Sequence, residues 1–258
     1  MSAPAVVITG AVAGIGRAIA LRLLAAGWAV VAVDLDADGL AALEREQAGA
    51  GLVGVAGDVA EPWTLERAAA VARERFGRLD AWVNNAGVPT EGPFEQETLE
   101  RLDRTLAVNL RAPLLGCQVA VKAFLESGTA GAIVNVSSIH ARAGFPGWIA
   151  YDAAKGGIDA LTRSVCVEFG ARGIRCNAVA PGAVLTAATG RVLAAAEDRE
   201  ALQRQWRELS PMGVVLTPDD VAAAVAYLLS ADARFVNGHV LAVDAGMAAR
   251  CVALPPPR

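Results

Sequence analysis

Thr9-Gly10-Ala11-Val12-Ala13-Gly14-Ile15-Gly16 stands where a short apolar run gives way to residues spaced as in a helix. Glycine at such a point allows a tight turn, a close approach of the backbone to a pyrophosphate, and close packing of helix on strand. The first helical turn adds unpaired N–H groups and the positive end of the helix dipole, which attract phosphate. The Gly-x-x-x-Gly-x-Gly spacing in this setting therefore predicts a dinucleotide site that includes Gly10, Gly14, Ile15 and Gly16.

The first half of the chain alternates short, Val-rich runs with longer amphipathic segments. The runs expected to form strands are Val6–Thr9, Ala29–Val33, Leu52–Ala56 and Ala81–Asn84. The segments expected to form helices are Ile15–Ala26, Leu40–Gln47 and Leu65–Phe76, with Pro62 opening the last of them. This βαβ alternation predicts a Rossmann-type, doubly wound parallel sheet with helices on both faces.

The second half continues the pattern without a linker. We expect helices over 109–127, 151–169 and 217–229, and strands over 132–137, 174–180 and 239–243. A single domain spanning 1–258 follows. Residues 186–210 form a polar insertion with helices of its own, which we expect to close over the substrate, and residues 250–258 form a Pro-rich tail.

Composition excludes several classes of protein. With 23 basic against 27 acidic residues, the chain carries no excess positive charge for nucleic acid or an anionic membrane. No apolar run has the length of a membrane span, and we do not expect a signal peptide, because the first apolar run already has the pattern of a strand. The four cysteines have no paired spacing, and His140 and His239 lack metal-ligand spacing. We therefore expect reduced thiols, no metal site and a cytoplasmic protein.

Asp34 ends the second expected strand, eighteen residues after Gly16. An acidic side chain there can accept hydrogen bonds from the adenosine ribose and repels a 2′-phosphate. Position 13 is Ala and position 35 is Leu, so neither neighbour offers a basic partner for that phosphate. NAD is therefore expected rather than NADP. The other interpretation is that Asp34 merely starts a turn together with Asp36 and Asp38.

Tyr151 and Lys155 lie four residues apart in Tyr151-Asp152-Ala153-Ala154-Lys155, and Ser138 lies thirteen residues upstream of the tyrosine. Residues at i and i+4 share one helix face, about 5–6 Å apart. An ammonium group there can lower the pKa of a phenol toward a value useful for acid–base catalysis. Many helices contain such a pair by chance, but here it accompanies a nucleotide-binding glycine loop.

Together these residues resemble the short-chain dehydrogenase/reductase family over nearly the whole chain. Further matches to its motifs are Asp58-Val59, Asn84-Asn85-Ala86-Gly87, Asn109, Ile133–Ser138, Pro181-Gly182, Val184 and Thr186. The resemblance implies hydride transfer between NAD(H) and a secondary alcohol or ketone. It also implies that Tyr151 exchanges the proton, Lys155 assists it, Ser138 binds the substrate oxygen and Asn109 orders a water.

By the same resemblance, residues 58, 59, 85–87, 181, 182, 184 and 186 contact the cofactor, as do Tyr151 and Lys155. Two positions depart from the family pattern: Val214 stands where many members have Arg, and Ala245 where Gly is usual. Neither belongs to the catalytic set, so only packing or subunit contacts are affected.

The segment between Ser138 and Tyr151 must pass the active site. His140 and Trp148 are candidate substrate residues, although Trp148 and Phe145 could equally pack in the core. Ser138-Ile139-His140 resembles sugar and polyol dehydrogenases of the family, so such a substrate is favoured. Hydroxysteroids, dihydrodiols and 3-oxoacyl thioesters are alternatives, and a non-catalytic nucleotide sensor is a rival function.

The helices expected over 109–127 and 151–169 are apolar on more than one face, which is more than packing on one sheet requires. In the family the equivalent helices pair across a two-fold axis. We therefore expect a homotetramer, in which the tail could help close a neighbouring subunit's pocket.

Overall fold

The computed structural model describes residues 3–249 and contains one parallel sheet of seven strands. The strands are β1 (Ala5–Thr9), β2 (Ala29–Asp34), β3 (Leu52–Ala56), β4 (Ala81–Asn84), β5 (Ala132–Val136), β6 (Arg175–Pro181) and β7 (Val240–Val243). Their order across the sheet is β3-β2-β1-β4-β5-β6-β7. The direction of winding reverses between β1 and β4, where a crevice forms at the carboxyl ends of the strands. The predicted doubly wound sheet is confirmed.

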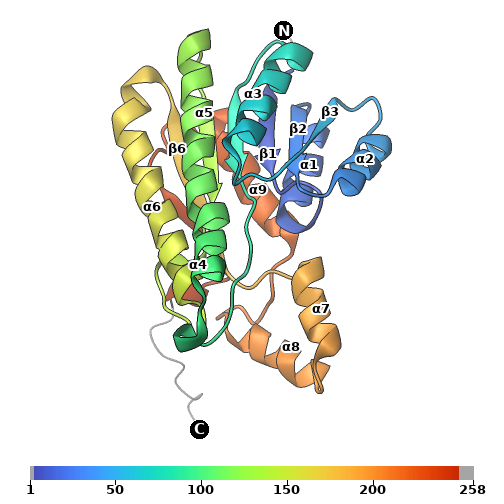
Figure 1. Cartoon of the computed structure of the whole chain (residues 1–258), viewed down its shortest axis with the longest axis vertical. Helices are drawn as coiled ribbons and strands as arrows, with labels where there is room; N and C mark the ends of the chain where they lie inside the picture. The colour runs from blue at the N-terminus through green and yellow to red at the C-terminus, as the bar shows by residue number, and fades with distance from the viewer. Residues whose placement is uncertain (1–2, 250–258) are drawn as a thin grey trace.

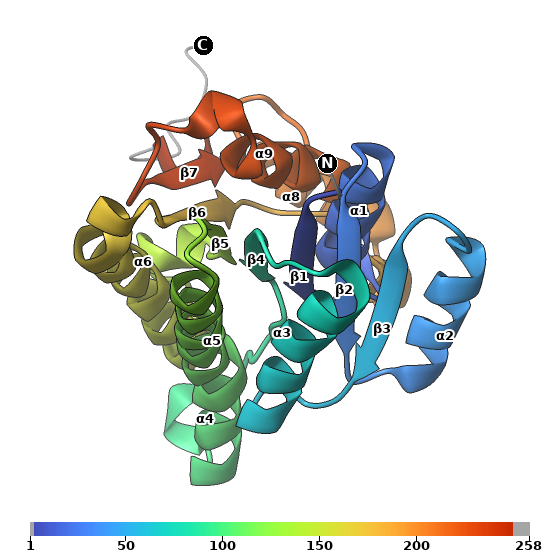
Figure 2. The same cartoon turned by 90° about the horizontal axis from the view of Figure 1, so that it is seen from above.

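Helices cover both faces of the sheet (Figures 1 and 2). One face carries α3 (Pro62–Phe76), α5 (Ala112–Ser127) and α6 (Ile149–Phe169); the other carries α1 (Gly14–Ala25), α2 (Ala37–Glu46) and α9 (Pro218–Leu229). Because side chains alternate along a strand, Val7 of β1 lies in the first core while Val6 and Ile8 lie in the second. Burial on both faces accounts for the Val-rich strands.

Two helices begin earlier than their apolar pattern indicates. The first turn of α2 starts at Ala37, three residues before the predicted Leu40, because the Asp36 Oδ1 atom accepts the Gly39 N–H at 2.9 Å and caps the helix. In α3 the helix starts at Pro62, where the missing N–H of proline costs nothing. Capping residues and proline, rather than apolar spacing, set these boundaries.

The helix predicted over 109–127 is the second part of a longer helical segment. Helix α4 (Leu99–Leu106) begins after the N-cap Thr98, and a single π-helical turn over Ala107–Arg111 joins it to α5. The prediction missed α4, in which half of the side chains are both polar and exposed. The π turn is placed at Asn109, which is completely buried.

The polar insertion contains two helices, as predicted: α7 (Ala187–Ala195) and α8 (Arg199–Glu208). They lie together at the end of the molecule opposite the N-terminus (Figure 1). The predicted tail, 250–258, lies outside the described residues. None of the helices between residues 3 and 249 combines the length and apolar content that a bilayer span requires.

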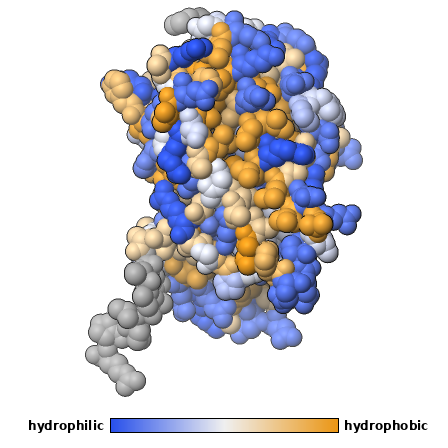
Figure 3. All heavy atoms as spheres, turned by 60° about the vertical axis from the view of Figure 1, so that its left-hand side comes forward, coloured by the Kyte–Doolittle hydropathy of each residue, from blue (hydrophilic) through white to orange (hydrophobic). Residues whose placement is uncertain are grey.

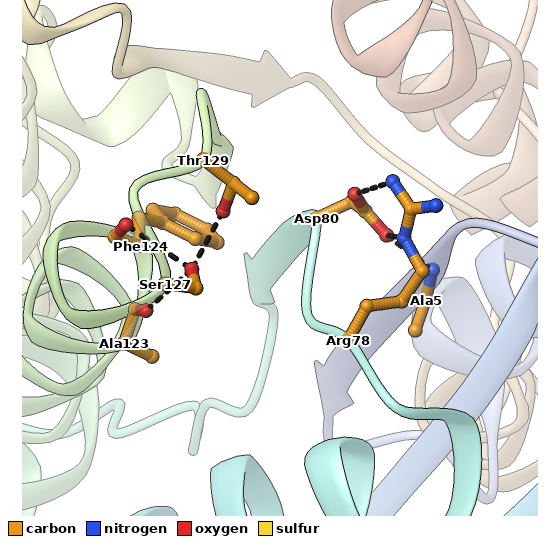
Figure 4. A network of polar contacts seen from close by, with 7 residues as sticks. All are labelled: Ala5, Arg78, Asp80, Ala123, Phe124, Ser127 and Thr129. Atoms are coloured by element: carbon orange, nitrogen blue, oxygen red, sulfur yellow. Dashed lines mark hydrogen bonds and ion pairs between the residues drawn. The ribbon is translucent and has the colours of Figure 1, made fainter.

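The amino ends of the strands are held by the polar contacts shown in Figure 4. The Asp80 Oδ2 atom accepts the Ala5 N–H at 2.8 Å and the Arg78 Nε–H at 2.7 Å, which aligns the starts of β1 and β4. At the same edge, Ser127 Oγ donates to the Ala123 carbonyl at 2.9 Å where α5 ends. These contacts stabilise the edge away from the crevice.

Candidate active site

A cleft of about 320 Å³ opens at the carboxyl ends of the strands on either side of the switch point. Several predicted cofactor residues line it together: Gly10, Asp34, Asp58, Val59, Asn85, Ala86 and Gly87. They come from the carboxyl ends of β1, β2, β3 and β4 and the loops that follow these strands. Their convergence fits a ligand with several separate parts, as a dinucleotide has.

The glycine loop has the close contacts that exclude side chains. A Cβ atom on Gly16 would lie 1.9 Å from the Gly10 carbonyl oxygen, and one on Gly10 would lie 2.9 Å from Ala86 Cα. Gly10 and Gly14 also have positive φ angles, 66° and 54°. The helix α1 begins at Gly14, so its unpaired N–H groups face the cleft end of β1. These residues fit a pyrophosphate.

The loop after β4 is bound directly to the glycine loop. Asn85 Nδ2 donates to the carbonyl oxygens of Thr9 and Gly10 at 2.9 and 3.0 Å. In return, Thr9 Oγ1 accepts the N–H groups of Asn85 and Ala86 at 3.0 and 3.1 Å. These four bonds hold residues 85–87 as one wall of the cleft.

The Asp34 carboxylate makes turn contacts and also lines the cleft. Its Oδ2 atom accepts the Val12 N–H of the glycine loop at 3.0 Å, and its Oδ1 atom accepts the Asp36 N–H at 3.1 Å. It therefore lines the cleft and also starts the turn into α2. The two interpretations of Asp34 do not exclude each other.

Arg104 of α4 also lines the cleft, which the sequence did not indicate. Its Nη1 atom lies 2.6 Å from Asp58 Oδ2, and forty-six positions along the chain separate the two residues. Burial alone would raise the pKa of the Asp58 carboxyl, but the Ala60 N–H and the Arg104 guanidinium outweigh it and hold that pKa below its usual value. The Arg104 charge is thus paired with Asp58.

The segment after β6 reaches over the glycine loop. Pro181 ends β6, the Gly182 N–H donates to the Val243 carbonyl at 2.9 Å, and Val184 forms a bridge with Leu216. Thr186 then caps α7, and a Cβ atom on Gly14 would lie 3.4 Å from Thr186 Cγ2. Thr186 therefore adjoins the loop that starts α1.

The four predicted catalytic residues converge beside this cleft. Ser138, Asn109 and Lys155 are buried, and Lys155 Nζ lies 5.4 Å from the centre of the Tyr151 ring. Lys155 Nζ donates to the Val136 carbonyl at 2.9 Å. A Cβ atom on Gly87 would lie 2.9 Å from Asn109 Oδ1 and 4.0 Å from Lys155 Nζ, so both side chains meet at the cleft wall.

The Asn109 side chain is held by the backbone of Val88. Its Oδ1 atom accepts the Val88 N–H at 3.1 Å, and its Nδ2 atom donates to the Val88 carbonyl at 2.9 Å. The amide therefore joins the π turn to the loop after β4, and it is neutral at any working pH. This pairing was not evident from the sequence.

Burial dominates the acid–base properties of the tyrosine and the lysine. It raises the pKa of Tyr151 to about 12, aided by the Asp152 charge and opposed by hydrogen bonding to Ser138. It lowers the pKa of Lys155 to about 8, opposed by the Asp159 charge. In the protein alone, burial therefore holds the Tyr151 pKa above its usual value.

His140 forms one wall next to Tyr151. Its ring stacks on Phe145 with centroids 4.0 Å apart, and it meets the rings of Trp148 and Tyr151 edge-on, each at 5.2 Å. Its Nδ1 atom lies 2.6 Å from Asp152 Oδ1. Phe145 and Trp148 are half-buried and belong to this aromatic group rather than to the sheet cores.

Sequence reasoning did not predict that Asp152 binds His140, although Asp152 directly follows Tyr151 in the run that defines the site.

Between residues 3 and 249, no group of three or more His, Cys, Asp or Glu side chains could hold a metal ion. The thiols of Cys117, Cys166 and Cys176 are free, and two of them, Cys117 and Cys176, are buried.

Comparison with known proteins agrees with this geometry. A family model described as enoyl-(acyl carrier protein) reductase matches residues 10–248. The 3beta-hydroxysteroid dehydrogenase 1 of Eggerthella lenta is 39% identical over 94% of this chain and 92% of its own length. The D-threitol dehydrogenase of Mycolicibacterium smegmatis is 38% identical over 93% of this chain and 90% of its own.

Among solved structures, that of an actinorhodin polyketide ketoreductase variant with NADPH superimposes with a TM-score of 0.90. It is 30% identical in sequence, and the match covers 96% of this chain and 98% of that one. The similarity therefore extends over the sheet, the cleft and the residues beside it.

Proposed function

Because the chain belongs to the short-chain dehydrogenase/reductase family, we propose that it is an NAD(H)-dependent oxidoreductase that interconverts a secondary alcohol and a ketone. The observation that carries this proposal is the convergence of Ser138, Tyr151 and Lys155 beside a cleft suited to a dinucleotide. The direct test is to follow NADH absorbance while the protein is offered secondary alcohols. Loss of that signal in Tyr151→Phe ties it to this site.

The proposed chemistry divides between the cofactor and the protein. A nicotinamide supplies or accepts the hydride when it is bound. The Tyr151 hydroxyl exchanges a proton with the substrate oxygen, while the Ser138 hydroxyl donates a hydrogen bond to that oxygen. Since burial raises the pKa of Tyr151 to about 12, Lys155 alone does not prepare the phenol. The Tyr151 pKa would be lowered further by the positive charge that a bound, oxidised nicotinamide would supply.

NAD is proposed in preference to NADP. The Asp34 carboxylate lines the cleft, and the guanidinium of Arg104 in the same cleft is paired with Asp58. A 2′-phosphate would therefore meet a negative charge without a free positive one from either residue. The comparable ketoreductase structure carries NADPH, so kinetics with both cofactors are the decisive measurement for this chain.

A sugar or polyol is the proposed substrate class. His140 and Asp152 place a polar pair directly beside Tyr151, which suits a substrate with a second oxygen next to the reacting one. The similarity to D-threitol dehydrogenase supports this class. A hydroxysteroid is the second candidate, because Phe145 and Trp148 offer an apolar wall and 3beta-hydroxysteroid dehydrogenase 1 is a relative.

The insertion over 186–210 is proposed to close over the substrate. Thr186 at its start adjoins the glycine loop, and α7 and α8 lie next to each other beyond it. Its helix α8 has no buried residue between Arg199 and Glu208, so little packing holds it in place. The rest of the chain is proposed to form one domain with it.

The protein is also proposed to be a cytoplasmic homotetramer. A groove of about 430 Å³ runs between α5 and α6, and its apolar lining is Leu114, Val121, Leu125, Leu161, Val165 and Phe169. Figure 3 shows apolar side chains gathered on the face that these helices form. A second copy would cover that groove. Free, buried thiols at Cys117 and Cys176 fit a reducing compartment.

A further inference from the structure

Helix α6 binds the end of strand β5 through two residues one helical turn apart, Lys155 and Asp159. The Val136 carbonyl accepts from Lys155 Nζ at 2.9 Å, and the next residue, Ser137, donates from Oγ to Asp159 Oδ1 at 2.6 Å. Ser138 follows directly and is the proposed substrate-binding hydroxyl. Two partners from one helix face thus hold the strand end that positions this hydroxyl.

Asp159 is a buried carboxylate that the proposed mechanism does not use. Its side chain is 9% exposed, and it lies one helical turn beyond Lys155 on α6. We propose that Asp159 is a positioning residue that keeps the Lys155 ammonium charged while it holds Ser137, and through it the strand end before Ser138. This inference rests on the proposed oxidoreductase function and goes beyond it in naming what maintains the lysine's charge.

The charge balance supports this role. A buried ammonium tends to lose its proton unless a carboxylate lies near. Burial lowers the pKa of Lys155 to about 8, and the charge of Asp159 acts in the opposite direction. Without that charge the ammonium would lose its proton at lower pH. The lysine could then no longer stabilise a deprotonated Tyr151.

Several other charged groups on α6 and on the elements packed against it have partners of their own. On α6 itself, Asp152 binds His140. In the neighbouring elements, Arg104 pairs with Asp58 and Arg101 with Glu97. Arg111 donates to the Ala60 carbonyl, and Arg175 donates to the Leu228 carbonyl. Arg142 is the cation that faces Asp159: its Nε atom lies 3.8 Å from Asp159 Oδ2, and half of its side chain is exposed. It weakens the effect of Asp159 on Lys155 rather than replacing it.

The test is the pH profile of ketone reduction in Asp159→Asn. Asparagine can still accept from Ser137 Oγ but carries no charge. The probe is NADH with the faster of two ketones, erythrulose or a 3-ketosteroid. We expect the alkaline limb of kcat/KM to move at least about one pH unit lower, so that activity near pH 8 falls about fivefold or more while activity near pH 6 falls less than about threefold.

Two further variants separate charge from packing. Asp159→Glu restores the charge and should return the limb toward the unmodified position. Ser137→Ala removes the hydrogen bond but leaves both charges, so its limb should stay within about 0.3 pH units of the unmodified enzyme. Two outcomes would overturn the proposal. In the first, Asp159→Asn loses activity equally at every pH. In the second, the alkaline limb of Asp159→Glu moves as far as that of Asp159→Asn.

If Asp159→Asn does not fold, as judged by circular dichroism, Arg142→Gln is the second test. Removing this cation strengthens the field of Asp159, so the alkaline limb should move to higher pH. An unchanged limb, or one that moves to lower pH, contradicts the proposal. Tyr151→Phe separates the proposed function from the role of Asp159. An active Tyr151→Phe enzyme would refute the proposed function. If Tyr151→Phe is inactive and the alkaline limb of Asp159→Asn does not move, only the role of Asp159 is refuted.

Discussion

The Nδ1 atom of His140 lies 2.6 Å from the Oδ1 atom of Asp152, the residue that directly follows Tyr151. The other carboxylate oxygen of Asp152 accepts the Phe145 N–H at 3.0 Å. One carboxylate thus fixes both an imidazole and the loop that carries it, next to the phenol that we propose exchanges the proton. Asp152 therefore links the His140 loop to helix α6, and several measurements follow from this arrangement.

Replacing His140 should affect a polyol more than a simple alcohol. In His140→Ala we expect kcat/KM for threitol to fall at least about tenfold, as for a lost hydrogen bond to a substrate oxygen, while that for 2-butanol falls less than about threefold. His140→Phe is the matched control, because it retains the ring that stacks on Phe145. Equal losses with both substrates would show that the imidazole only shapes the wall.

Tyr151→Phe removes the one ionisable oxygen from the proposed proton path. We expect kcat to fall by about 10²–10⁴-fold, the usual contribution of acid–base catalysis. The dissociation constant for NAD, measured by calorimetry, should change little. A variant that retains more than about a tenth of the unmodified kcat would remove Tyr151 from this role.

The ionisation of Tyr151 can be read directly, because Tyr227 is the only other tyrosine. In a Tyr227→Phe background, burial should keep the phenol protonated near pH 10–11, since its pKa is raised to about 12. Phenolate absorbance should then appear at lower pH once NAD⁺ is added. Circular dichroism at each pH verifies the fold, and a phenol that titrates normally without cofactor would contradict the burial argument.

Asp34→Ala should weaken NAD binding and relax discrimination against NADP. The unmodified chain should prefer NAD, because the carboxylate at the cleft repels a 2′-phosphate and Arg104 is paired with Asp58. The measurement is kcat/KM for both cofactors in both proteins. An unmodified enzyme that prefers NADP would refute this assignment.

The apolar groove between α5 and α6 should be covered in solution. Leu114 lines it and is 47% exposed in the single chain. Leu114→Glu should shift light scattering from a tetramer toward smaller species, because a second copy would have to bury the new charge. Trp63→Glu, at an exposed position of α3, is the control and should leave the mass unchanged. A monomeric unmodified protein at micromolar concentration would disprove the assembly itself.

Much of this protein could be predicted from short-range patterns. The glycine loop, the alternation of strands and helices, Asp34 at the end of β2 and the spacing of Tyr151 and Lys155 are all local features. Period-two and period-3.6 repeats, and the conformations that only glycine allows, depend on neighbours a few residues apart. The sequence alone therefore determined the doubly wound sheet, and it determined which residues follow the carboxyl ends of its strands.

The tertiary structure decided which partners these residues contact and how deeply they are buried. Arg104 pairs with Asp58 and Ser137 with Asp159 across forty-six and twenty-two positions in the chain, and no periodic pattern connects such partners. The π turn that buries Asn109 follows a charged helix that apolar spacing did not reveal. The pKa of Tyr151 lies above that of a free phenol because loss of hydration sums over every element packed around it, whereas sequence spacing shows only the one nearby lysine.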